Sequence, residues 1–213
     1  LGFYFVKIDA EVINLQKNRV NIRYLIDKGK KAKIAKIYFL GDKKIREKKL
    51  RDVITSQENK FWKFISGNVY LNKERIGLDK RLLSNYYRNK GFYEVDIKTT
   101  NVEYSEGEGF VLTYNIDAGK RYIIKKISTN VDSVFDKKIF EPLQKDYNKY
   151  LGQYYSPFSI KKLLDEIDLL IENKNIQFVE HNVETIVEND GIEIKFNIFE
   201  TEKILVERID ITG

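Results

Sequence analysis

Apolar and polar residues alternate with a period of two in several short stretches of the chain. In residues 92–99, Tyr93, Val95 and Ile97 alternate with charged residues, and residues 110–116 alternate in the same way. Such alternation is typical of strands that bury one face. The segment Ser-Glu-Gly-Glu-Gly between them predicts a tight turn, so we expect an antiparallel hairpin. Residues 34–40 and 192–198 predict further strands, and the strand expected within 176–187 is less regular.

Other stretches carry apolar residues at helical spacing. Residues 45–54 and 72–87 each place their apolar side chains three or four positions apart, with Asn72 as the expected N-cap of the second helix. The clearest helix is predicted over 157–171, where Ser156 and Pro157 form the N-cap and first-turn pair. Gly91 lies where a left-handed C-terminal cap is expected.

The elements recur, which indicates an internal repeat. The phrase Gly-Phe-Tyr occurs at 2–4 and again at 91–93, and a strand-like phrase starts at Ile34, at Ile124 and at Val206. Each complete unit has the order β-α-α-β-β. We therefore expect a piece of a longer repeat array with four parts: residues 1–30 (the end of one domain), 31–119 and 120–201 (complete domains), and 202–213 (the first strand of another). The expected joints are 28–33, 118–121 and 201–203.

This element order predicts an α+β fold. The third strand of a unit can lie between the first and the second, parallel to the first and antiparallel to the second, with both helices on one face of the sheet. The second strand is then left at an edge. Its unpaired N–H and C=O groups can be completed by an incoming strand.

Composition removes several classes of function. The 213 residues include no cysteine, so disulfides and thiolate sites are excluded, and a single histidine, His181, argues against His-pair metal sites and a Ser-His-Asp triad. The formal charge of +6 arises from 38 basic residues, mostly lysine, interleaved with 32 acidic ones. That distribution favours a solvated mixed-charge surface over a nucleic-acid interface. No apolar run approaches the length of a membrane helix.

Three features each allow a structural and a functional interpretation. Phe61 and Trp62 lie in an aromatic loop that we expect to pack over the helices, with a protein-binding hot spot as the alternative. His181 is expected to be an ordinary strand residue rather than a pH switch. Gly107 and Gly109 precede a strand and not a helix, so they indicate a hairpin turn rather than a phosphate loop.

The ordered phrases resemble those of POTRA domains. They are Ile-x-x-Ile-x-Phe-x-Gly at 34–41, Tyr-Tyr-x-x-x-Gly-Phe at 86–92 and Asn-Ile-x-x-Gly at 115–119, and together with Leu-Arg-Asp-Val-Ile at 50–54 they are similar to the units of outer-membrane assembly factors of Gram-negative bacteria. In that comparison the four parts correspond to the second through fifth POTRA units. Val131, where neighbouring units have glycine, and Pro142, inside a predicted helix, depart from the pattern.

The resemblance implies a periplasmic scaffold of a protein anchored through a C-terminal β-barrel. Its partners would be unfolded outer-membrane proteins and accessory lipoproteins, with no nucleic acid, no cofactor, no metal and no catalysis. The resemblance leaves open a POTRA region of a secretion or import channel. From the residues alone, a KH-type RNA-binding module shares the order β-α-α-β-β, but the GXXG loop of that class is absent. An acid pair such as Glu103 and Glu106 is a weak argument for an enzyme.

The candidate binding site follows from the expected edge strand. We predict that an incoming strand pairs with residues 92–99, and that the corresponding edge of the second complete unit, residues 178–184, is a weaker site. We also predict an interdomain hinge. The edge strand comprises Phe92, Tyr93, Glu94, Val95, Asp96, Ile97, Lys98 and Thr99, and the hinge comprises Ala118, Gly119 and Lys120.

Overall fold

The computed structural model describes residues 3–17, 19–29, 31–60, 67–105, 107–202 and 210. The aromatic loop around Phe61 and Trp62 therefore lies outside the described residues. Contacts between residues divide the chain into two units. The first comprises Leu1–Tyr86 and Val95–Ala118, and the second comprises Tyr87–Glu94 and Gly119–Gly213.

The first unit begins with a hairpin of β1 (Lys7–Leu15) and β2 (Arg19–Asp27). Almost all of its side chains are exposed within the described chain. The residues after the first Gly-Phe-Tyr phrase lead directly into β1, just as those after the second lead into β4 (Asp96–Ser105). Phe3 and Tyr4 thus precede a strand, as Phe92 and Tyr93 do, while Gly2 lies outside the described residues.

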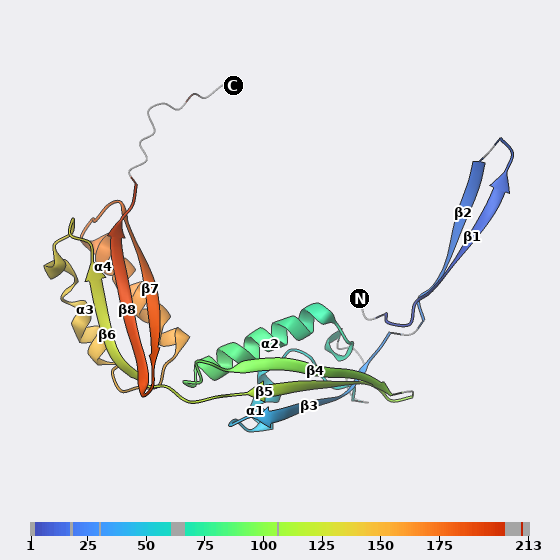
Figure 1. Cartoon of the computed structure of the whole chain (residues 1–213), viewed down its shortest axis with the longest axis horizontal. Coiled ribbons are helices and arrows are strands. Elements are labelled where there is room, and N and C mark those ends of the chain that lie inside the picture. Colours follow the sequence, from blue (N-terminus) through green and yellow to red (C-terminus); the bar gives the residue numbers. More distant parts are fainter. Residues whose placement is uncertain are drawn as a thin grey trace. The chain divides into compact units, whose positions relative to one another are not determined.

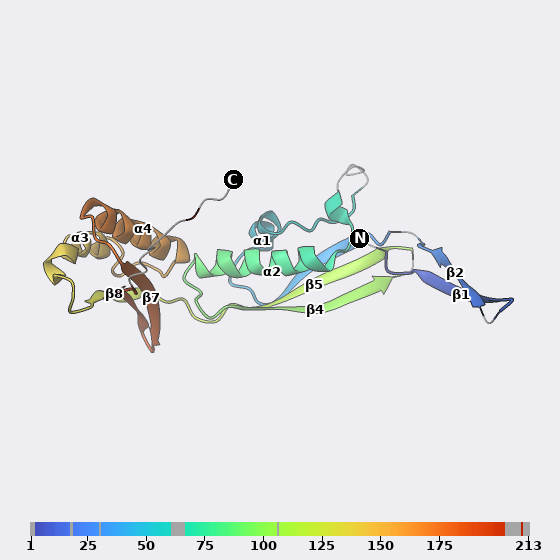
Figure 2. The same cartoon turned by 90° about the horizontal axis from the view of Figure 1, so that it is seen from above.

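The first unit also holds a complete three-stranded sheet of order β3-β5-β4. The central strand β5 (Gly109–Asp117) is parallel to β3 (Ile34–Asp42) and antiparallel to β4. Figures 1 and 2 show α1 (Glu47–Val53) and α2 (Lys73–Arg88) on one face of this sheet. A short 3₁₀ turn, Gly67–Val69, precedes α2. The α+β class and the strand order expected from the sequence are confirmed.

The ends of α2 follow from local chemistry. The Asn72 side-chain oxygen accepts a hydrogen bond from the Arg75 amide at 2.7 Å, which satisfies one of the amides that a helix start leaves unpaired. After the helix, Gly91 adopts a φ of +93°, a conformation that side chains with a Cβ rarely adopt. The chain can therefore turn sharply away from α2 at this residue.

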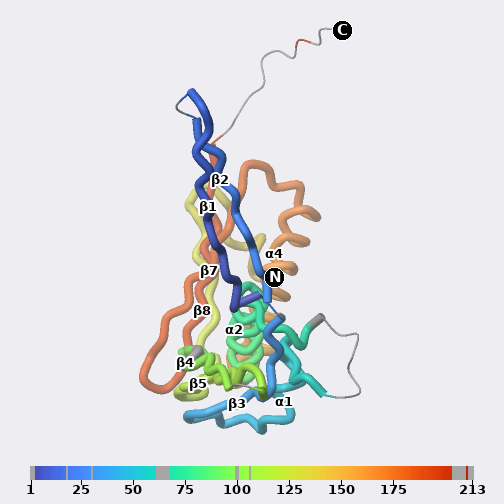
Figure 3. Tube along the Cα trace, turned by 90° about the vertical axis from the view of Figure 1, so that its right-hand side faces the viewer, coloured from blue at the N-terminus to red at the C-terminus, as the bar shows by residue number. Residues whose placement is uncertain are grey.

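The second unit repeats the architecture with a sheet of order β6-β8-β7. Its strands are β6 (Ile124–Val131), β7 (Val179–Glu188) and β8 (Gly191–Glu200), and Figure 3 traces β7 and β8 side by side, in agreement with their pairing. A 3₁₀ turn (Lys137–Phe140) precedes α3 (Leu143–Asn148), which Pro142 caps rather than interrupts. The last helix, α4 (Pro157–Asn173), starts as predicted, because the Ser156 hydroxyl accepts from the Ser159 amide.

Each core lies between the sheet and its two helices. The buried residues of the second unit come from β6, β8, α3 and α4 and include Ile124, Leu143, Leu163, Ile167, Ile194 and Phe196. Burial of each such side chain contributes about 1.5–3 kcal/mol. Among the described residues, every helix is too short or too polar to cross a membrane.

Candidate strand-binding edges

Only part of the predicted site on the edge of the first sheet lies in a strand. Strand β4 starts at Asp96, so only the second half of residues 92–99 is strand, and the expected start at Phe92 is wrong. Phe92 and Val95 are buried although they precede the strand. Val95 alternates with the buried Ile97 of the strand, so the sequence pattern continues past the point where the strand begins.

The residues just before β4 pack within the second unit. The Tyr122 hydroxyl donates to the Glu94 carboxylate, and this hydrogen bond raises the pKa of Tyr122. The Tyr93 ring meets the Tyr155 ring edge to face, with centroids 5.0 Å apart. Glu94 and Tyr93 therefore have partners of their own and do not flank an open strand edge.

The outer edge of β4 carries two features that oppose regular pairing. Asp96 and Lys98 form an ion pair at 3.0 Å, and this hydrogen bond to Asp96 raises the pKa of Lys98. The register of β4 against β5 shifts between Thr99 and Asn101, which marks a β-bulge. Charges and bulges both discourage an edge strand from pairing with another chain. The bulge divides the regularly paired part of β4 into residues 96–99 and residues 101–105.

The corresponding edge strand of the second unit, β7, pairs with β8 without any register shift. His181 occupies the position of Ile97, because both pair with an isoleucine of the central strand. Its Nε2 lies 2.7 Å from Asp168 Oδ1 on α4, and its buried Nδ1 has no hydrogen-bond partner among the described residues. His181 thus joins the strand to the helix, which fits the ordinary strand residue that we expected.

The opposite edge of the first sheet is closed by a pair of side chains that sequence reasoning missed. The Ile37 amide on β3 donates to Glu58 Oε1 at 3.0 Å, and the Ile37 carbonyl accepts from Arg51 Nη2 at 2.5 Å. Arg51 and Glu58 also pair with each other at 2.7 Å. Partial burial raises the pKa of the Glu58 carboxyl, but the Ile37 amide and Arg51 lower it by more, so the net pKa lies below its ordinary value. We call Arg51 and Glu58 the edge clamp.

A second feature that sequence reasoning missed is a buried carboxylate in the first core. Asp79 on α2 is fully buried and accepts from the Thr55 amide and hydroxyl at 2.6 and 2.7 Å. It also accepts from the Ser56 amide at 3.2 Å and from the Tyr114 hydroxyl at 2.9 Å. Burial, and after it the Asp79 charge, raise the pKa of Tyr114. Asp79 therefore fixes the segment after α1 against the sheet.

The predicted hinge residues occupy the boundary between the two units. Ala118 ends the first unit, is fully buried, and donates its amide to the Asp42 carbonyl at 3.2 Å. Gly119 begins the second unit with a φ of +64°, and Lys120 follows it. The positive φ explains a glycine at this place.

Comparison with known proteins agrees with this geometry. Residues 32–119 match the POTRA family, described as surface antigen variable number repeat. The chain is 25% identical over 211 residues to the outer membrane protein assembly factor BamA of Neisseria meningitidis, covering 98% of this chain and 26% of that protein. The BamA of Buchnera aphidicola is 26% identical over 97% of this chain and 34% of its own length.

Residues 32–119 thus match the POTRA family, and the chain as a whole is similar to the POTRA-containing part of BamA proteins. It spans about a quarter to a third of the length of these relatives. The match favours the POTRA interpretation over the KH-type alternative.

Solved structures show the same fold. The POTRA3-5 segment of Haemophilus influenzae BamA has a TM-score of 0.53 at 14% identity, covering 94% of this chain and 74% of that one. The BamA of Haemophilus ducreyi lacking POTRA domains 1-3 has a TM-score of 0.54 at 14% identity, covering 79% of this chain and 29% of that one. The tandem POTRA architecture expected from the sequence is confirmed.

Proposed function

We propose that this chain is part of a periplasmic scaffold that receives unfolded outer-membrane proteins by strand addition and docks accessory lipoproteins during β-barrel assembly. The observation that supports the proposal is a tandem of three-stranded sheets, each with two strands that have a neighbour on only one side. The backbone of such a strand can bond a passing strand of almost any sequence. The relatives' name, outer membrane protein assembly factor, agrees with this role.

For the first unit we propose the edge of β4 as the receiving strand, as expected from residues 92–99. Residues 96–99 are the part of β4 that lies within the expected site, and a bulge separates them from the paired residues 101–105. A short receiving edge suits a scaffold, because a client held by few backbone bonds can be released again. The role needs hydrogen-bonding groups and surface rather than catalytic side chains.

The proposal is tested by an NMR titration of the whole chain with a peptide copied from a strand of an outer-membrane barrel. We expect amide shifts along β4, centred on residues 96–99. A matched control peptide carries the same side chains but N-methyl groups on alternate backbone amides, which removes the donors of one edge. Shifts confined to the helices, or equal shifts with the methylated peptide, would contradict strand addition.

We further propose that Ala118, Gly119 and Lys120 act as a hinge between the two units. The left-handed conformation of Gly119 supports this assignment, since no heavy atom beyond its chain neighbours lies within 4 Å of the place where a Cβ would stand. Solution scattering of the chain tests it. We expect a distribution of interunit angles, and a single unvarying angle would contradict the hinge.

A further inference from the structure

The first strands of the two sheets, β3 and β6, hold the same place. Each is parallel to its central strand, and each has a bulge directly after its first paired residue, Ile34 or Ile124. After the bulge, Ile37 pairs with Leu112 and Ile127 pairs with Ile194. The backbone groups of Ile127 therefore point away from the sheet, toward the open edge, as those of Ile37 do.

At the start of this edge, the backbone of the first strand accepts a hydrogen bond from a following segment in both units. The Asn59 amide donates to the Ile34 carbonyl at 2.7 Å, and the Gly152 amide donates to the Ile124 carbonyl at 2.8 Å. This pair of hydrogen bonds aligns the segments that follow α1 and α3. Counting back from Asn59 and Gly152 places Leu151 where the first unit has Glu58, and Gln144 where it has Arg51.

The edge clamp of the first unit therefore has no counterpart in the second. The Leu151 side chain cannot accept a hydrogen bond, and this residue is 38% exposed. Gln144 donates instead to the Asn148 side chain at 3.0 Å. In the described part of the second unit, the outward amide and carbonyl of Ile127 thus lack the carboxylate and guanidinium that cover Ile37.

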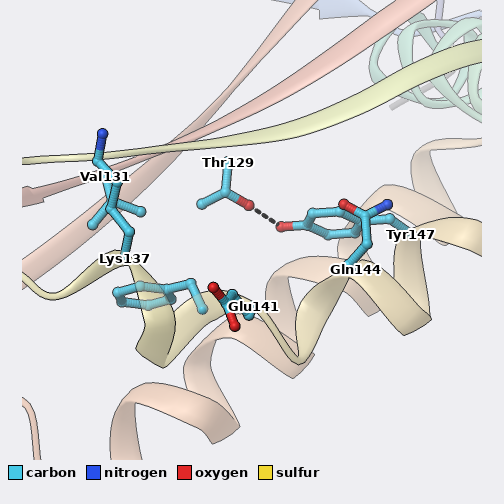
Figure 4. A pocket seen from close by; sticks show the side chains of 7 residues that line it. Thr129, Val131, Lys137, Glu141, Gln144 and Tyr147 are labelled. Carbon is cyan, nitrogen blue, oxygen red and sulfur yellow. Dashed lines mark hydrogen bonds between the residues drawn. The ribbon is translucent and has the colours of Figure 1, made fainter.

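A groove of about 430 Å³ lies beside this uncovered edge. Thr129 and Val131 of β6 form one side, and Gln144 and Tyr147 lie opposite (Figure 4). Phe140 also lines the groove. The groove exists because Thr129 stands where the first unit has Phe39, whose ring is buried and stacks on Tyr114. The Thr129 hydroxyl hydrogen-bonds the Tyr147 hydroxyl and leaves the remaining space unfilled.

The chemistry of this surface specifies its occupant. The edge clamp offers Ile37 an acceptor for its amide and a donor for its carbonyl, which are the two groups that a neighbouring peptide backbone presents. The groove combines apolar walls with one cation, Lys137, and one anion, Glu141, so it has no net charge to attract a charged side chain. An extended peptide with a neutral, apolar side chain meets both requirements.

We propose that the second unit binds an extended segment of unfolded polypeptide along β6, with an apolar side chain of that segment in the groove between β6 and α3. This inference rests on the proposed function, and it names an acceptor other than the edges of β4 and β7. The first unit is closed to the same mode of binding by its own edge clamp.

The test introduces the edge clamp of the first unit into the second. In the whole chain, Gln144→Arg and Leu151→Glu together rebuild the clamp at Ile127, and both positions are exposed, so the core is unchanged. Leu169→Glu with Asn173→Arg on the exposed side of α4 introduces the same charges away from the groove and is the matched control. The probe is a ten-residue capped peptide of alternating valine and threonine, followed by two-dimensional NMR of the amides.

We expect peptide-induced shifts at Ile127 and Thr129 in the wild type and the control, and binding there about tenfold weaker or more in the clamp variant. Shifts on β4 or β7 with none on β6 would overturn this inference and leave the proposed function standing. Shifts on β6 that persist in the clamp variant would overturn the inference too. The absence of shifts on every strand would overturn both.

Discussion

The two three-stranded units share one topology but protect their sheet edges differently. In the first, the edge clamp covers β3 and a bulge with an adjacent ion pair interrupts β4. In the second, β7 runs without a bulge and β6 has leucine and glutamine where the clamp would be. The difference teaches that a repeated fold fixes where the edges lie, while a few side chains decide whether each edge is available.

The two cores also differ, because the first contains buried polar side chains at positions where the second has apolar ones. Asp79 and Leu163 lie equally far from the N-caps Asn72 and Ser156. Tyr114 and Phe196 hold the same register position in the central strands. All four side chains are buried. The first unit therefore holds the segment after α1 by hydrogen bonds to a buried carboxylate, whereas the second has apolar side chains at the two corresponding positions.

The largest effect is expected from breaking the polar core. Asp79→Ala leaves the Thr55 and Ser56 amides and the Tyr114 hydroxyl without their acceptor, so the free energy of unfolding of the first unit should fall by about 3 kcal/mol or more. Urea unfolding followed by NMR signals of each unit measures the change. The exposed carboxylate Asp52 is the control: Asp52→Ala should change stability by less than about 0.5 kcal/mol. Similar losses for the two variants would contradict the role of Asp79.

The next effect comes from removing the edge clamp. Arg51→Gln with Glu58→Leu gives the first unit the residues of the second, and we expect a stability loss of about 1–2 kcal/mol because the pair is only half buried. The variant should also gain peptide-induced shifts at Ile37, which the wild type lacks. Unchanged behaviour of Ile37 toward peptide would show that the clamp does not guard this edge.

A smaller effect is expected from acidification. The pKa of folded Glu58 lies below its ordinary 4.5, so the clamp contributes fully above that pH and its contribution is lost as the pH falls through the folded value. The stability difference between the wild type and Glu58→Gln should therefore be constant near neutrality and shrink below pH 4.5. Urea unfolding at a series of pH values measures this difference. A stability difference that grows on acidification would contradict the stabilising role of the ionised Glu58 carboxylate.

The smallest effect concerns His181, which replaces the isoleucine found at position 97. His181→Ile removes the buried, unpartnered Nδ1 and restores an apolar side chain on the helix-facing side of β7. Because an unsatisfied buried polar atom is costly, stability should stay unchanged or rise by up to about 1 kcal/mol. Thermal unfolding of the second unit measures it. A clear loss of stability would show that the contact with Asp168 outweighs that cost.

Much of the fold could be predicted because its signals are local. The alternation in β5 and the N-caps Asn72 and Ser156 each depend on residues close in sequence, and the structure confirms them. The start of β4 was misplaced because Phe92 and Val95 are buried outside the strand, and periodicity alone does not separate that case from a strand.

The side chains that distinguish the two units could not be predicted from local pattern. Asp79 meets Tyr114 only after the sheet and helix have packed, and Arg51 meets Glu58 and the Ile37 backbone only through the fold. Before folding, each is one charged residue among many. Aligning the two repeats residue by residue would have flagged Asp79 against Leu163 as a buried charge opposite an apolar side chain, which is the signal that was available.

The central claim, that the first unit covers the outward edge of its first strand and the second leaves it open, is tested most directly by amide hydrogen exchange in the free chain. The amides of Ile37 and Ile127 occupy equivalent positions, and only Ile37 has an acceptor in Glu58. We expect Ile37 to be protected and Ile127 to exchange much faster, with Ile37 becoming fast in Glu58→Leu. Equal protection of the two amides would contradict the claim.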